Sequence, residues 1–215
     1  MTTQTPLSGD RTSAEMFFDP ACPWAWMTSR WLMEAAQVRD LDITWSVMSL
    51  SVLNEGRDLD EDYRRFNDGA WVGPRSIIAA TKDLPQNEAN ALRKKMYDAY
   101  GQRIHLDGRG TSDYVGLVRE VVEELGLDPA IVETAQGESV DTELRASHQR
   151  AMDLVGDDVG TPVVKVGDVA FFGPVVTPAP KGEDAGRLWD GCVLVAGTPG
   201  FYELKRTRTQ GPDLS

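Results

Sequence analysis

Residues 17–26 have the sequence FFDPACPWAW, in which an apolar strand ends in a turn, the turn holds Cys22, and Pro23 begins a helix directly behind it. Proline suits the first position of a helix because its missing N–H has no partner to lose there. A cysteine at such a junction is typical of thiol redox sites of the Cys-x-x-Cys kind. The second cysteine position of that motif is occupied by Ala25. The site therefore has a single thiol and cannot close its own disulfide.

The position of Cys22 predicts a reactive thiolate. Unpaired backbone N–H groups and the dipole at a helix start favour an anion by roughly 0.3–1 kcal/mol, and the thiolate is the nucleophilic form of cysteine. The nearest carboxylate, Asp19, is a candidate proton acceptor. The alternative is an inert cysteine that only fills the junction between strand and helix, since free cysteines are usually buried.

The N-terminal part of the chain has the pattern of a βαβ unit. Residues 14–19 are predicted as a buried strand, residues 23–38 as a helix, and the alternating, β-branched residues 43–50 as a second strand. Such a unit is parallel and right-handed by default.

The middle of the chain is predicted to be helical, and β structure returns near the C-terminus. A hairpin is predicted from a strand at 163–166, a turn at Gly167-Asp168 and a strand at 169–172. Apolar residues on one face predict a last helix at 182–196. The predicted helices of the middle part are 61–66, 74–82, 86–102, a helix capped by Ser112 or Asp113 that ends at Leu125 before Gly126, and 139–155.

This order predicts an α/β fold with an inserted helical domain. The α/β domain comprises residues 14–59 and 156–209, and the inserted helical domain comprises residues 60–155. Residues 1–13 are predicted to be disordered, and 210–215 form a C-terminal tail.

Composition narrows the class of protein. The 41% hydrophobic content suffices for a core, and two cysteines form no disulfide framework. Residues 1–13 lack the apolar stretch of a signal peptide, and no apolar segment is long enough to span a membrane. We therefore expect a cytoplasmic protein without a membrane partner. A net charge of −12 argues against nucleic acid. The basic cluster Lys205, Arg206 and Arg208 is predicted to be a solvated tail segment, with a local role toward an anionic ligand as the alternative.

A second element of the site precedes the returning strand. Thr161-Pro162 stands at the start of this strand and is a candidate cis peptide, because cis bonds are far less costly before proline than elsewhere. Such a turn would leave the backbone of Thr161 free beside the thiol to pair with an extended ligand. The alternative is an ordinary trans proline at a strand edge.

Several motifs together resemble the mycothiol-dependent nitroreductase branch of the DsbA-like thioredoxin superfamily, over about residues 14–209. The resemblance implies a thioredoxin-like fold with a helical insertion, and a cytoplasmic, actinobacterial oxidoreductase. The motifs are DPACPWAW at 19–26, VMSL at 47–50 with Asn54, QRIH at 102–105, VGTP at 159–162, FFGP at 171–174 and FYELKRTR at 201–208.

The resemblance also implies roles for individual residues. Cys22 corresponds to the attacking thiol, Pro23, Trp24 and Ala25 to the rest of the active-site loop, and Thr161-Pro162 to the cis-proline loop. Asp19, Asn54, Tyr63 and His105 fall among the residues that bind substrate or thiol. From the residues alone, Trp24 would more often be core, Asn54 a turn residue, Tyr63 a half-packed surface residue, and His105 a capping or exposed histidine.

The implied reaction reduces disulfides or electrophilic small molecules of nitro or quinone type through a mixed disulfide with mycothiol as cosubstrate. A mycoredoxin-like protein is a further candidate reductant. No metal, flavin or nucleotide motif is visible in the sequence.

Ala25 is the departure from the family, which normally has the resolving cysteine there. Cys192 is a poor substitute because it lies on the apolar face of the predicted last helix, so we expect it to be structural. Ala25 fits either a natural monothiol homologue or an engineered change that traps a mixed disulfide. Two other functions remain open: a thiol transferase or isomerase acting on aromatic substrates, and a non-catalytic thiol-binding protein.

Overall fold

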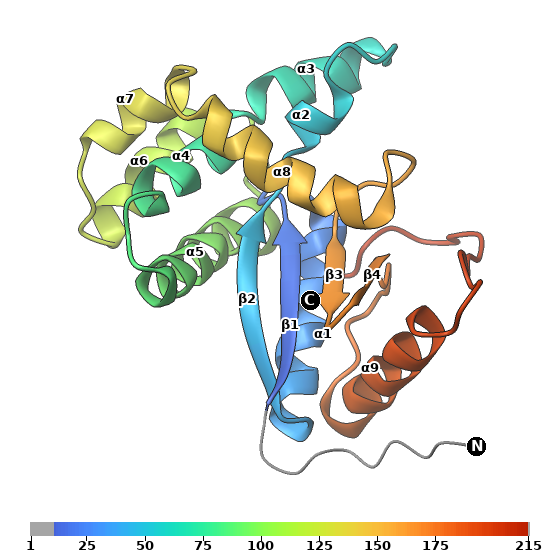
Figure 1. Cartoon of the computed structure of the whole chain (residues 1–215). Coiled ribbons are helices and arrows are strands. Elements are labelled where there is room, and N and C mark those ends of the chain that lie inside the picture. Colours follow the sequence, from blue (N-terminus) through green and yellow to red (C-terminus); the bar gives the residue numbers. More distant parts are fainter. Residues whose placement is uncertain (1–10, 215) are drawn as a thin grey trace.

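The computed structural model describes residues 11–214 and contains a four-stranded sheet surrounded by helices (Figure 1). In chain order, the elements are β1 (Thr12–Phe18), α1 (Pro23–Val38), β2 (Leu41–Val47), α2 (Leu50–Asn54), α3 (Glu61–Gly69), α4 (Val72–Thr81), α5 (Gln86–Gly101), the π-helix η1 (Gln102–Leu106), α6 (Tyr114–Glu124), α7 (Ala130–Gln136), α8 (Asp141–Val155), β3 (Val163–Val166), β4 (Val169–Phe172) and α9 (Gly182–Ala196).

The sheet has the strand order β2-β1-β3-β4. Strands β1 and β2 are parallel, with Phe18 opposite Val47, and are joined through α1, so the predicted parallel βαβ unit is confirmed. Strand β3 runs antiparallel to β1 and forms the predicted hairpin with β4. The hairpin turn needs Gly167, whose φ of 56° is rarely adopted by residues with a side chain.

The two faces of the sheet are covered by different helices, because successive side chains of a strand point to opposite faces. Met16 and Phe18 of β1 belong to the main core, which includes residues of α1. Phe17, between them, packs with Met152 of α8 in a second cluster. The first turn of α1 therefore begins in the main core, at the carboxyl end of β1.

The helices between β2 and β3 share this main core with the sheet. Buried residues of α4 to α8 and of the strands form one continuous hydrophobic cluster. Helix α8, which the sequence assigns to the inserted domain, packs against β2, β3 and β4 and crosses the sheet in Figure 1. The division into two domains stays a prediction.

Several predicted boundaries differ from the structure by a few residues, and two of them concern the ends of the sheet strands. The second strand ends at Val47 rather than Leu50, because Ser49 is the N-cap of α2 and its side chain accepts the N–H of Val52. Strand β1 begins at Thr12, so the last residues of the predicted disordered segment belong to the sheet, whereas residues 1–10 lie outside the described residues. The sequence did not predict α2, α7 or η1.

Candidate functional site

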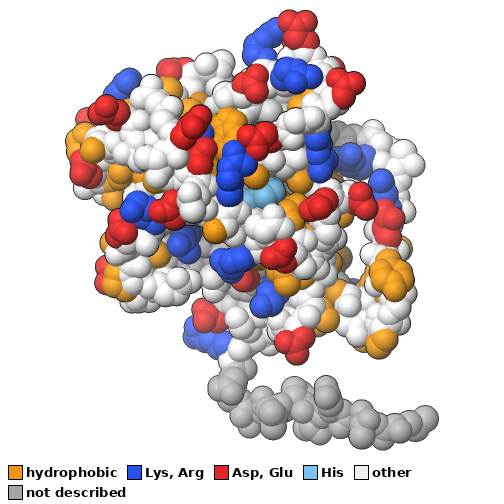
Figure 2. Space-filling view, turned by 45° about the horizontal axis from the view of Figure 1, so that its top comes forward, with side chains coloured by type: hydrophobic (Ala, Val, Ile, Leu, Met, Phe, Trp, Pro, Cys, Tyr) orange, Lys and Arg blue, Asp and Glu red, His pale blue; other side chains and the backbone are white. Residues whose placement is uncertain are grey.

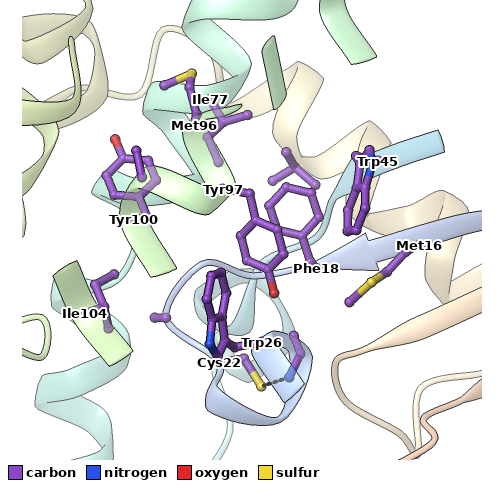
Figure 3. Close-up of a cluster of buried hydrophobic side chains, with 14 of the residues drawn as sticks. Met16, Phe18, Cys22, Trp26, Trp45, Ile77, Met96, Tyr97, Tyr100 and Ile104 are labelled. Atoms are coloured by element: carbon purple, nitrogen blue, oxygen red, sulfur yellow. Dashed lines mark hydrogen bonds between the residues drawn. The ribbon is translucent and has the colours of Figure 1, made fainter. Parts of the chain in front are cut away.

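Cys22 is the N-cap of α1, as the sequence predicts, and its side chain is almost fully buried, with 5% exposed. Its Sγ accepts a hydrogen bond from the backbone N–H of Ala25 at 3.4 Å (Figure 3). Trp26 lies beside it on the same first turn, below the stacked rings of Phe18 and Tyr97. Ala25 is itself fully buried, so a cysteine at this position would be enclosed as well.

The Thr161-Pro162 turn lies against the thiol. The Cys22 thiol donates a hydrogen bond to the carbonyl oxygen of Thr161 at 3.5 Å, across 139 residues of sequence. The Thr161–Pro162 peptide bond is cis, as the sequence predicts. The hydroxyl of Thr161 is buried and has no hydrogen-bond partner among residues 11–214. One unpaired polar group therefore lies on the residue that contacts the thiol.

The expectation of a low pKa for Cys22 is wrong for this conformation. Burial raises the pKa of the thiol to about 12, and the Asp19 carboxylate raises it further, while the N–H groups of Ala25 and Trp24 lower it. A rise from 9.0 to about 12 corresponds to about 4 kcal/mol against ionisation. The helix start favours the anion by only about 1 kcal/mol. Desolvation wins, and Cys22 is held as a neutral thiol.

Asp19 fastens the Cys22 loop to the start of α2. Its carboxylate is fully buried and accepts the N–H of Ala21 at 2.8 Å and the N–H of Leu50 at 2.7 Å. Burial raises the pKa of Asp19 to about 6, against the opposing effect of these two hydrogen bonds. Both oxygens are engaged by the backbone, so Asp19 acts first as a brace for the loop.

His105 approaches the same loop from η1, so the expectation of a capping or exposed histidine is wrong. The side chain is buried, and its Nε2 lies 3.0 Å from the carbonyl oxygen of Pro20. A carbonyl oxygen only accepts, so Nε2 carries the proton and donates. Burial lowers the pKa of His105 to about 4, which makes the ring neutral at pH 7. Trp26 packs against this ring, and Gly101 leaves room for the indole.

Asn54 and Tyr63 form a second cluster with Asn67, a residue that the sequence did not single out. The Asn54 amide donates to the Tyr63 hydroxyl at 3.4 Å and to the Asn67 side chain at 3.2 Å. It also donates to the carbonyl oxygen of Leu50, whose N–H binds Asp19. Leu50 thus joins this cluster to the Cys22 loop. Asn54 and Asn67 line a hollow of about 170 Å³.

Trp24 is half-buried, and the guanidinium of Arg208 lies over its ring, 5.3 Å from the centroid. Arg208 belongs to the C-terminal segment, by which we mean residues 197–214. This segment returns to the body of the protein where the Asp213 N–H donates to Thr177 and where Leu214 packs on the main core. Arg208 therefore contacts the active-site loop, which a purely solvated tail would not do.

The second cysteine, Cys192, is half-buried on α9, and burial raises its pKa to about 11. Both cysteines are free thiols. Within residues 11–214, no group of three or more histidine, cysteine or acidic side chains is arranged to hold a metal ion. No helix in that part of the chain is long and apolar enough to cross a membrane.

Solved structures define the class of the fold. The chain is similar to Chlamydia trachomatis DsbA (10% identity, 90% of this chain and 91% of that chain, TM-score 0.54). It is similar to a probable DsbA oxidoreductase, SCO1869 from Streptomyces coelicolor (19% identity, 94% and 97%, TM-score 0.54). It is also similar to a 2-hydroxychromene-2-carboxylate isomerase (16% identity, 84% and 94%, TM-score 0.53). The fold is therefore the DsbA-like thioredoxin fold, which confirms the predicted fold class.

The sequence then places the chain within that class. Residues 21–206 match the Rv2466c-like family, described as mycothiol-dependent nitroreductase Rv2466c, and the chain belongs to this family. The chain is therefore a thiol-dependent oxidoreductase, as the motifs predict. A relative from Mycobacterium tuberculosis, "Uncharacterized protein Rv2286c", is 29% identical over 199 residues, which are 92% of this chain and 83% of the relative.

Proposed function

We propose that Cys22 is the only redox thiol of an enzyme that reduces disulfides or electrophilic nitro- or quinone-like small molecules, with mycothiol as cosubstrate. The observation that carries this proposal is the contact between Cys22 and the carbonyl of Thr161, which places the thiol beside the cis-proline turn. The family match is the reason for naming mycothiol as the cosubstrate. Both cysteines of the chain are free, which suits a reducing cytoplasm.

The proposed chemistry with a disulfide substrate has two exchange steps at Cys22. The Cys22 thiolate attacks one sulfur of the substrate, a bond from Sγ to that sulfur forms, the substrate S–S bond breaks, and the other half leaves as a thiolate. A mycothiol thiolate then attacks the substrate sulfur of the mixed disulfide, which forms a mycothiol–substrate S–S bond, breaks the bond to Sγ and releases Cys22 as a thiolate. Reduction is completed away from Cys22, where a second mycothiol thiolate releases the substrate thiolate and forms mycothiol disulfide. Each attacking thiol yields its proton to the solvent, and each leaving thiolate takes a proton from the solvent. Because Ala25 has no sulfur, the second step needs an external thiol, either mycothiol or a mycoredoxin-like protein.

The raised pKa of Cys22 sets a condition on the first step. In the buried state the thiol proton is donated to Thr161, and ionisation would leave an anion facing a carbonyl oxygen. The reacting state must therefore expose Sγ or replace this contact. A bound substrate that pairs with the Thr161 backbone would do so, and the unpaired Thr161 hydroxyl is a ready hydrogen-bond donor for it.

The residues near the loop suit a thiol carried on an uncharged, hydroxyl-rich molecule such as mycothiol. Asn54 and Asn67 offer amide groups at a small hollow, and the Tyr63 hydroxyl accepts a hydrogen bond from Asn54. Leu50 connects these groups to Asp19 and thereby to the Cys22 loop. We assign Asn54 and Tyr63 to binding of the thiol, Asp19 and His105 to positioning of the loop, and Trp24 to contact with a planar substrate.

A second candidate is thiol transfer or isomerisation on an aromatic substrate without net redox change. It is favoured by the neutral, hydrogen-bonded state of Cys22 and by the missing second sulfur at Ala25. Thiol consumption separates the two functions, since reduction oxidises two thiols for each substrate and isomerisation oxidises none. A protein that binds thiols without turnover would neither oxidise thiols nor convert a substrate.

The decisive experiment compares this chain with its Ala25→Cys variant, each in a Cys192→Ala background, after incubation with mycothiol disulfide. Intact-mass measurement is expected to show a stable mycothiol adduct on the chain with Ala25 and none on a Cys22→Ser control. Disulfide reduction by each protein is then assayed with mycothiol. Turnover in both proteins supports a monothiol enzyme. Turnover only in the variant identifies Ala25 as the lesion in an ancestral mechanism. No adduct on either protein would remove mycothiol from the proposal.

A further inference from the structure

The guanidinium over Trp24 stands next to the reacting loop. Trp24 lies in the first turn of α1, two residues after Cys22, and the Arg208 guanidinium lies 5.3 Å from its ring centroid. A cation over an indole face gains about 0.5–1 kcal/mol at an exposed site. This contact holds the charge of Arg208 beside Trp24, which belongs to the same loop as Cys22.

The charge of Arg208 is not neutralised by an ion pair within residues 11–214. Most arginines of the described chain form ion pairs, such as Arg39 with Glu183 and Asp190 and Arg75 with Asp141. Among residues 11–214, no carboxylate lies within ion-pair distance of Arg208. The chain has 34 acidic and only 22 basic residues, so carboxylates are plentiful, yet none pairs with Arg208 within residues 11–214.

The C-terminal segment is attached to the body of the protein at residues that follow Arg208 in the chain. Beyond Arg208, the Asp213 N–H donates to Thr177 at 2.7 Å, and Leu214 packs on the main core. The chain therefore returns from an exposed stretch to a fixed point, as the red segment of Figure 1 shows. Figure 2 shows basic, acidic and hydrophobic side chains along the right margin of the molecule.

We propose that Arg208 and Trp24 select carboxylate-bearing aryl disulfides and related aryl electrophiles at Cys22. The proposal rests on the proposed function, in which Cys22 is the reacting thiol. Guanidinium binds a carboxylate through paired N–H donors, and Trp24 offers an aromatic surface for the ring that bears it. A neutral aryl disulfide gains only the ring contact. The −12 chain as a whole repels anions, so attraction toward Cys22 depends on this local cation.

The selected step is thiol–disulfide exchange. The Cys22 thiolate attacks one sulfur of the aryl disulfide, a bond from Sγ to that sulfur forms, the aryl S–S bond breaks, and one arylthiolate leaves with the electron pair. The Cys22 proton passes to solvent. The carboxylate of the bound half stays at Arg208 and takes no part in bond making.

The test uses two aryl disulfides of similar size, dithiobis(nitrobenzoate), whose rings each carry a carboxylate, and neutral dithiodipyridine. Second-order rate constants for arylthiolate release are measured in a Cys192→Ala background, and intact mass locates the adduct on Cys22. Arg208→Gln is expected to slow the reaction with the dianionic reagent about tenfold, the size of one charge-assisted hydrogen bond, and to leave the neutral reagent within about twofold. Arg206→Gln removes the same charge from the same segment and is expected to change neither rate by more than about twofold.

The dependence of the reaction rate on ionic strength is an independent test of the role of Arg208. Raising ionic strength is expected to slow the dianionic reagent with the parent protein, because a local attraction is screened, and to speed it with Arg208→Gln, where only the repulsion by the net negative chain remains. An equal fall for both reagents in Arg208→Gln would show a structural role and overturn the proposal, as would no fall for either. If neither reagent modifies Cys22 in the folded parent protein, the proposed function fails and this inference fails with it.

Discussion

The Cys22 loop and the C-terminal segment meet at Trp24 but are built in opposite ways. The loop is buried, and its backbone is bound by Asp19, which directly follows β1, and by His105 of η1. The C-terminal segment is almost entirely exposed between residues 197 and 213 and touches the loop through Arg208. The buried region supplies stability and the geometry of the nucleophile, whereas the exposed region supplies the positive charge beside Trp24. Substitutions in the two regions should therefore change different measurements.

The largest expected effect is on stability against acid, and it belongs to the buried region. Burial lowers the pKa of His105 and of His148 from 6.5 to about 4, so each stabilises the fold above pH 6.5 and loses that contribution, about 3 kcal/mol, as pH falls toward 4. Asp19 opposes them: burial raises its pKa from 3.8 to about 6, so its contribution of about 3 kcal/mol is present below pH 3.8 and lost as pH rises through 6. These three groups predict a net loss of about 3 kcal/mol from pH 7 to pH 4.

Urea unfolding at several pH values measures this loss, and His148→Gln isolates one part of it. The Nδ1 atom of His148 accepts the N–H of Ser49 at 3.3 Å, and a glutamine oxygen can accept the same bond without titrating. The variant should lose about 3 kcal/mol less than the parent between pH 7 and pH 4. Equal pH slopes in the two proteins would show that His148 does not stay neutral in the fold.

The next effect comes from Gly101, which lies beneath Trp26. A Cβ at this position would lie 1.9 Å from the indole, so Gly101→Ala must displace Trp26 and the first turn of α1. Overpacking of this kind costs about 1–3 kcal/mol, and we expect a value near 2 kcal/mol from urea unfolding at pH 7. An unchanged midpoint would mean that Trp26 moves freely, and the buried region would then be less rigid than its contacts indicate.

These contrasts also show how far the sequence alone can lead. Cys22 at the N-cap and Pro23 at the helix start are local features, and the sequence predicted them together with the helix to Val38 and the hairpin. The closeness of Thr161 to the thiol was predicted from the Thr-Pro at the start of the returning strand, and the family resemblance implied the same. The raised pKa of Cys22 did not follow, because desolvation depends on which distant segments cover the thiol.

The same limit applies to the groups that support the loop. His105 reaches Pro20 only because η1 interrupts the α-helical ladder after Gly101, and no local signal distinguishes such a turn from a helix end. Leu50 was predicted as a strand residue, yet its N–H and C=O connect Asp19 with Asn54. Backbone links of this kind carry no mark in the side-chain pattern.

A smaller effect concerns the charge beside the thiol. Asp19 raises the pKa of Cys22, so Asp19→Asn should lower that pKa and speed alkylation of Cys22 by iodoacetamide several-fold between pH 7 and pH 9. An asparagine accepts through only one oxygen, so one of the two N–H bonds from Ala21 and Leu50 is lost, at a cost of about 1–3 kcal/mol. Rates are compared under conditions where both proteins are folded. A slower reaction in the variant would show that Asp19 serves as the proton acceptor rather than as a source of repulsion.

The smallest expected effect is the same glycine-to-alanine change made in the C-terminal segment. Nothing lies within 4 Å of a Cβ at Gly211, and its φ is not in the left-handed region. Pro212 follows it, and the extended backbone that proline imposes on the preceding residue is open to alanine. Gly211→Ala should therefore change the free energy of unfolding by less than about 0.5 kcal/mol and leave the rates of Cys22 with both aryl disulfides unchanged. A loss as large as that of Gly101→Ala would mean that the segment packs on a surface that the buried region depends on, and the two regions would then be one.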